Sequence, residues 1–163
     1  YPATSPATLI AAGELLKLGV DISAMTRRLY RTQPMNRVNL TRIAYNKLRF
    51  MFDGQVGVID FDKHDFEQTG CTFGLADGLV NKALEVEGVR MAVLASERED
   101  GIKMSLRAVE PDTVNDIAVL FGGGGHAQAA GCTIHAPLYE ALDQVLAAMK
   151  DKLEKTPRPE NRA

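Results

Sequence analysis

A run of four glycines followed at once by a histidine is the part of this sequence best suited to chemistry. It occupies residues 122–126 within the stretch FGGGGHAQAAGCTI. Glycine adopts positive φ angles and carries no Cβ, so another backbone or a ligand can approach it closely. Successive backbone N–H groups in such a turn form a concave site for anions. A helix C-cap and a tight turn need only one or two glycines, so four in a row favour a more demanding loop that cradles an anion.

Three side chains near this loop could complete an anion site. His126 follows the glycines directly, and an imidazole can donate to a phosphate or stack on a base; the alternative is a histidine that only caps or packs the turn. Arg107 ends the SLR segment upstream, and guanidinium is the natural bidentate partner of phosphate. Taken alone, it could equally be a surface arginine at the end of a strand. Ser105 lies two residues earlier, on the same face of an extended chain as Arg107.

Two other features are weaker candidates for a functional site. The segment DFDKHD contains Asp60, Asp62 and His64, whose spacing could place three metal ligands on one face. A solvated polar loop is the simpler interpretation of so turn-rich a stretch. Cys132 lies in a strand of small residues with no evident base beside it, which is typical of a buried small apolar residue and not of a nucleophile.

The elements that must position these residues follow from apolar periodicity and from helix and turn signals. The pattern predicts an α/β fold, with a helical connector followed by a small mixed β-sheet domain packed with helices and a boundary near residues 53–54. KHDFEQTG is expected to be a polar turn, and the tail that begins near residue 154 is expected to be frayed. The predicted helices are 6–19 (capped by Ser5), one starting at Asp21 or Ser23, 38–52, 74–88, one starting at Asp112 or Thr113 and ending at 121, and 137–153. The predicted strands are 55–62, 89–96, 101–110 and 131–136.

Composition excludes several classes of function. The chain has 163 residues and a net charge of −2, which argues against a protein that holds long nucleic acid by bulk positive charge. A short anionic ligand held by a few placed groups is compatible with this charge. The two cysteines lack CxxC spacing, so a reducing cytoplasm is expected. No apolar run is long enough to span a bilayer. The chain begins without methionine and reads as part of a longer protein.

Taken together, SLRAVE, the short apolar helix and FGGGGHAQAAG resemble the C-terminal, DHH-associated domain of the DHH phosphoesterase superfamily. GLADGLVNKALEVEGVRMAVL is similar to the preceding segment in the RecJ-like oligoribonuclease branch, whose members trim very short RNAs and dephosphorylate nucleoside 3′,5′-bisphosphates. YPATSPATLIAAGELLKLGVDI is similar to the end of the catalytic domain. The resemblance assigns residues 1–53 to the end of the catalytic domain plus connector, 54–155 to the substrate-binding domain and 156–163 to a disordered tail.

The resemblance implies a two-domain, manganese-dependent hydrolase with the substrate between its lobes. Arg107 and His126 match positions that contact the substrate phosphate, Gly123, Gly124 and Gly125 match the loop that lies against it, and Ser105 assists. No DHH triplet occurs in the sequence, so we expect no metal site and no catalytic residue within this chain, and no hydrolysis by it alone. Ala108 and Ala127 stand where a hydroxyl and a basic residue are frequent, which leaves fine specificity open.

Several alternatives remain within and outside this family. The lobe could belong to a cyclic-dinucleotide phosphodiesterase or to a RecJ-type single-strand exonuclease. A different class is a non-catalytic RNA-binding module, since related glycine-rich domains end the alanyl-tRNA synthetases. The expected partners are a short RNA or nucleotide and the protein's own N-terminal DHH domain, and the sequence also allows a homodimer.

Overall fold

The computed structural model describes residues 4–156. Contacts divide the chain into two compact units, residues 1–35 and residues 36–163. The sheet unit therefore begins well before residue 54, because the third helix contributes the buried residues Leu40 and Ala44 to its core. The proposed assignment of residues 1–53 to a catalytic domain and connector stays a prediction.

The first unit consists of short helices without a core of their own. Helix α1 (Pro6–Lys17) begins at Ser5, whose hydroxyl accepts from the Thr8 amide as predicted. Helix α2 (Ile22–Thr26) is capped by Asp21 and continues as a π-helical turn, η1 (Arg27–Arg31). None of the residues described in these three elements is buried.

The second unit is built on a six-stranded mixed sheet in the order β1-β2-β3-β4-β6-β5. Only β2 and β3 run parallel, and every other neighbouring pair is antiparallel. The strands are β1 (Arg49–Met51), β2 (Val56–Phe61), β3 (Met91–Arg98), β4 (Gly101–Ala108), β5 (Gly124–His126) and β6 (Ala129–Ile134). This mixed α/β arrangement confirms the predicted fold class.

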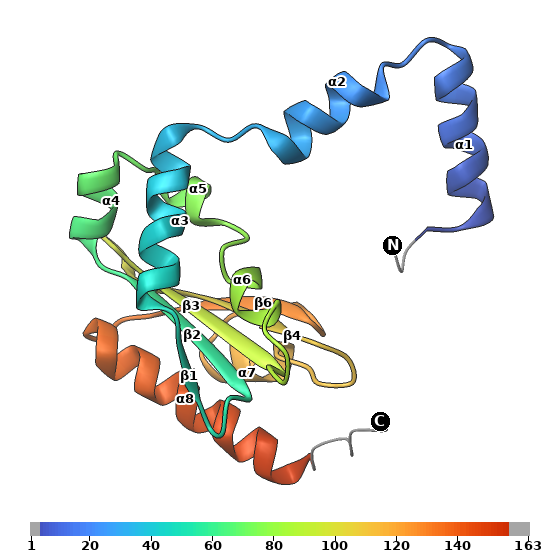
Figure 1. Ribbon diagram of the computed structural model, residues 1–163. Helices are drawn as coiled ribbons and strands as arrows, with labels where there is room; N and C mark the ends of the chain where they lie inside the picture. Colours follow the sequence, from blue (N-terminus) through green and yellow to red (C-terminus); the bar gives the residue numbers. More distant parts are fainter. Residues whose placement is uncertain (1–3, 157–163) are drawn as a thin grey trace. The chain divides into compact units, whose positions relative to one another are not determined.

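Helices cover the two faces of the sheet separately (Figure 1). On one face, α7 and α8 pack against Met104, Leu106 and the other alternate apolar residues of the strands. On the other face, α3 to α6 pack against β2 and β3, with Ile59 and Leu94 among the buried residues. The helices are α3 (Met35–Lys47), α4 (Lys63–Thr69), α5 (Phe73–Ala76), α6 (Asn81–Leu84), α7 (Asn115–Leu120) and α8 (Leu138–Lys155).

Three predicted elements were wrong in their bounds or type. The helix expected over residues 38–52 ends at Lys47, because residues 49–51 pair antiparallel with β2. KHDFEQTG is not a turn but helix α4, capped by Asp62 through a reciprocal bond with Asp65. The helix expected over 74–88 is two short helices, since Gly78 adopts a φ of 83° between them.

The ends of the sheet unit also differ from expectation. Glu154 and Lys155, predicted to begin the frayed tail, are the last residues of α8, and Thr156 accepts a hydrogen bond from Arg90 at 2.8 Å. Residues 157–163 of the tail lie outside the described residues. Pro137 is the N-cap of α8 and not its first helical residue. Among the helices that the structure describes, none combines the length and apolar character needed to cross a membrane.

Candidate anion-binding site

The register of the sheet brings the predicted site residues onto one face. Arg107 pairs with Ala129, and His126 pairs with the same alanine from the other side. Ser105 pairs with Gly131, which pairs in turn with Gly124. Directly opposed residues of antiparallel strands share a face, so the structure forms two parallel rows. One runs Arg107–Ala129–His126 and the other Ser105–Gly131–Gly124; we call them the cation row and the glycine row.

On this face α6 approaches β4, but among the residues described the helices leave β6 and β5 open. The intervening residues Met104 and Leu106 point into the core with α7 and α8. The opposite hydrophobic cluster takes residues from β2 and β3 but, among the residues described, none from β4, β5 or β6. Arg107 and Ser105 are half-buried and His126 is exposed. The two rows therefore form an accessible surface of small residues, which we call the floor of the site, with the Arg107 side chain at one end.

The four glycines serve different purposes. Gly122 (φ 70°) ends α7: its amide donates to the Val119 carbonyl, and the Gly123 amide donates to Ala118 at 2.9 Å. These two bonds form the Schellman cap of the helix. A Cβ on Gly123 would stand 2.2 Å from the Gly131 carbonyl oxygen, and one on Gly125 (φ 143°) would stand 2.5 Å from that of Ala129. Strand β6 of the chain itself is therefore what approaches these two glycines so closely.

Gly124 is different, because neither its backbone conformation nor its neighbours require a glycine there. A Cβ there would meet nothing within 4 Å, and its φ is not positive. It faces the open side of the sheet in the glycine row. Half of the predicted loop is in fact the edge strand β5, which the sequence did not indicate because glycines show no alternation of apolar and polar side chains.

Among the residues described, the hydrogen-bond donors on this face have no carboxylate partner. Within the part of the chain that the structure describes, Arg107 donates only to the neighbouring Leu106 carbonyl, at 2.9 Å, and its other guanidinium donors have no partner there. Within residues 4–156, no carboxylate forms an ion pair with Arg107, His126 or the nearby Lys103. Lys103 was missed by the sequence analysis, although its place four residues before Arg107 on one strand would have put it on the same face. Hydrogen-bond donors without a carboxylate partner, beside a surface of small residues, suit an anionic ligand.

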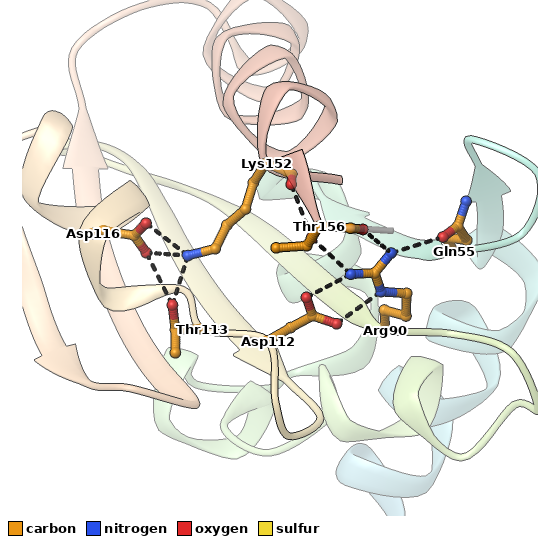
Figure 2. Close-up of polar contacts among 7 residues, drawn as sticks. All are labelled: Gln55, Arg90, Asp112, Thr113, Asp116, Lys152 and Thr156. Carbon is orange, nitrogen blue, oxygen red and sulfur yellow. Dashed lines mark hydrogen bonds and ion pairs between the residues drawn. The ribbon is translucent and has the colours of Figure 1, made fainter. Parts of the chain in front are cut away.

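A buried ion pair fixes the segment that leads into α7 (Figure 2). Arg90 donates to both carboxylate oxygens of Asp112 at 2.7 Å, and also to Gln55 and Thr156. Two residues after Asp112, the Val114 amide donates to the Ala127 carbonyl at 2.7 Å. The hairpin turn beside His126 is thus tied to a segment that the ion pair holds.

A second ion pair holds the start of α7 itself. Lys152 of α8 donates to Thr113 and to both carboxylate oxygens of Asp116, each at 2.6 Å (Figure 2). Burial disfavours the charged form of Asp116, but the hydrogen bond and the charge of Lys152, together with backbone hydrogen bonds, outweigh it. The pKa of Asp116 therefore lies below its usual value. The glycines therefore follow a helix that is fixed from two sides.

The acidic segment and the cysteine have structural explanations. Asp60 pairs with Arg49, and Asp62 and Asp65 cap α4 and bind Lys47. Over residues 4–156 no group of three His, Cys, Asp or Glu side chains is placed to hold a metal ion, so these residues do not fit a manganese site. Burial raises the pKa of the Cys132 thiol, which therefore remains protonated at neutral pH and is a poor nucleophile.

The sheet, its helices and the glycine-rich edge define an α/β domain of a known class: residues 41–155 match the DHHA1 domain, and the chain belongs to that family. It is 32% identical over 151 residues to the bifunctional oligoribonuclease and PAP phosphatase NrnA of Thermus thermophilus, covering 92% of this chain and 45% of that protein. The Bacillus subtilis protein of the same name is 29% identical, with 92% and 46% covered.

A solved structure shows the same fold. The exopolyphosphatase-related protein of Bacteroides fragilis superimposes with a TM-score of 0.87 at 26% identity, over 96% of this chain and 47% of that one. The chain thus spans just under half the length of these relatives. The comparisons confirm the resemblance to the DHH-associated domain of the oligoribonuclease branch.

Proposed function

We propose that this chain is the substrate-binding lobe of a phosphoesterase that hydrolyses short oligoribonucleotides from an end and nucleoside 3′,5′-bisphosphates. The observation that carries the proposal is the open face on which Arg107 and His126 flank Ala129 without a carboxylate partner among the residues described. The names of the two bacterial relatives supply the class of substrate.

In this proposal, the cation row binds the phosphate of the substrate. Arg107 supplies paired guanidinium donors, and His126 donates from the edge strand on the opposite side of Ala129. Ser105 and the backbone of Gly124 and Gly125 border the same site, while Gly123 holds β5 against β6. Positioning and charge neutralisation are large contributions to phosphoryl transfer, and these are what the chain's own residues would provide.

The reaction itself would take place in the remainder of a longer protein. Because the described residues do not fit a metal site, we propose that the manganese expected for this family is held by an N-terminal DHH domain and that the isolated chain does not hydrolyse substrate. The exposed apolar residues of α1, such as Leu9 and Leu15, would pack against that domain. A cytoplasmic location is part of the same proposal.

Binding can be tested separately from hydrolysis. Chemical-shift titration of the ¹⁵N-labelled chain with adenosine 5′-monophosphate and adenosine 3′,5′-bisphosphate should perturb amides of β5 and of residues 105–107. Arg107→Gln and His126→Gln should each weaken binding of both nucleotides about tenfold, since each removes a charge-assisted contact. Lys150→Gln is a matched control, because Lys150 lies on α8 beside Glu154. Unchanged binding in both site variants would contradict the proposal.

The alternatives predict other ligands. A single-strand exonuclease lobe should prefer a long DNA oligomer over both nucleotides, and a cyclic-dinucleotide phosphodiesterase lobe should prefer the cyclic compound. Comparing these ligands in the same titration distinguishes the readings.

A further inference from the structure

Lys103 adds a second positively charged side chain, besides Arg107, to the open face. It lies on β4 between the buried residues Ile102 and Met104, so its side chain points to the same side as Ser105 and Arg107. It pairs with Thr133 of β6 and with Ser96 of β3. Lys103 is therefore one row beyond the glycine row, on the side away from Arg107.

The Lys103 side chain bends back over the floor of the site. Its Nζ atom lies 3.5 Å, and its Cε atom 3.7 Å, from the position that a Cβ on Gly131 would occupy. The ammonium group therefore stands above the centre of the glycine row. At these distances a Cβ on Gly131 would be in ordinary contact with Lys103. What requires glycine there is the Met104 carbonyl oxygen, which lies 2.7 Å from the same Cβ position.

The spacing of the rows separates this ammonium from the first anion position. Alternate residues of an antiparallel strand lie about 7 Å apart, so the glycine row is about 7 Å from the row that holds Arg107 and His126. Two cations held apart in this way, neither of them paired with a carboxylate among the described residues, suit two separate anionic groups better than one.

We infer that Lys103, above Gly131 and next to Thr133, forms a second phosphate-binding position, so that the site selects substrates carrying two phosphates over those carrying one. This inference rests on the proposed function, in which Arg107 and His126 bind the first phosphate. A nucleoside 3′,5′-bisphosphate fills both positions, and so do successive phosphates of a short RNA. A mononucleotide fills only the position at Arg107.

The test compares one-phosphate and two-phosphate ligands on the 163-residue chain. Dissociation constants for adenosine 5′-monophosphate and adenosine 3′,5′-bisphosphate are measured by ¹⁵N chemical-shift titration up to millimolar concentration for the unsubstituted chain, Lys103→Gln, Arg107→Gln and the control Lys150→Gln. Lys103→Gln should weaken binding of the bisphosphate about tenfold and change that of the monophosphate less than twofold. The Gly131 and Thr133 amides should shift with the bisphosphate only.

The outcomes separate this inference from the proposed function. If Lys103→Gln weakens binding of both nucleotides equally, or of neither, the second phosphate position is overturned. If Arg107→Gln weakens binding of both nucleotides, the first phosphate position is upheld. If Arg107→Gln has no effect but Lys103→Gln acts selectively on the bisphosphate, the proposed first position fails and the one at Lys103 stands. If neither nucleotide binds the unsubstituted chain, both proposals fail. The amide spectrum of each variant reports whether it has kept its fold.

Discussion

Replacing the glycines of the 122–126 run one at a time should distinguish the glycines that the fold requires from those that ligand binding requires. In Gly123→Ala, the new methyl would lie 2.2 Å from the Gly131 carbonyl oxygen and 2.6 Å from the Cys132 Cβ. The obstructing oxygen belongs to the backbone of β6, so it cannot move aside as a flexible side chain would. In Gly125→Ala, the methyl would lie 2.5 Å from the Ala129 carbonyl oxygen, at a φ of 143° that alanine rarely adopts.

The magnitudes follow from these contacts. Inserting a methyl group into a closely packed site costs about 1–3 kcal/mol, and we expect Gly123→Ala to reach the upper end because the clash is with backbone. Gly125→Ala adds conformational strain to its clash. Gly124→Ala has neither, since a Cβ there meets nothing within 4 Å, and replacing a glycine in a strand is favourable by about 0.5–1 kcal/mol.

Urea denaturation of the three variants measures the free energy of unfolding directly. Gly124→Ala should be as stable as the unsubstituted chain or slightly more stable, yet bind adenosine 3′,5′-bisphosphate more weakly, because its methyl occupies the floor of the site. Gly123→Ala and Gly125→Ala should unfold at clearly lower urea concentration. Equal destabilisation in all three variants would refute the assignment of separate roles, and so would tight binding by Gly124→Ala.

Other parts of the domain allow equally direct tests. Asp112→Asn should lower the free energy of unfolding by about 3–5 kcal/mol, because it leaves the buried Arg90 guanidinium without its counter-charge; a loss below 1 kcal/mol in urea denaturation would show that water replaces the partner. The pKa of Asp116 is lower in the folded chain than in the unfolded chain, so this residue stabilises the fold at pH values above its unfolded pKa. The stabilisation is lost as the pH falls through the folded pKa. Lys152→Met should therefore flatten the acid limb of a plot of stability against pH, and an unchanged limb would contradict the linkage. Cys132 should react with a thiol reagent only on unfolding, since burial raises its pKa and leaves it 2% exposed; fast labelling of the native chain at pH 7 would disprove this.

The sequence by itself determined the local features of the fold. The apolar run VRMAVLAS predicted β3, alternate apolar residues predicted β4, and the period of the last helix predicted α8, because these patterns express which sides of an element face a core. Ser5 predicted the start of α1 through its capping hydroxyl, and of the two caps predicted for the second helix, Asp21 or Ser23, the structure uses Asp21. The glycine–histidine run and the SLR segment indicated the family, and the family match over residues 41–155 confirmed it.

Only the tertiary structure decided how those features combine. Strands β1 and β5 exist because distant segments offer them hydrogen-bonding partners, and no pattern within RFM or GGH reveals those partners. The roles of the four glycines were likewise set by what lies beside each: a helix end for Gly122, strand β6 for Gly123 and Gly125, and open space for Gly124. Long-range pairing also placed Lys103 above Gly131. Local sequence fixes the conformations a segment prefers, whereas contacts between segments far apart in the chain decide which backbone and side-chain groups remain free to meet a ligand.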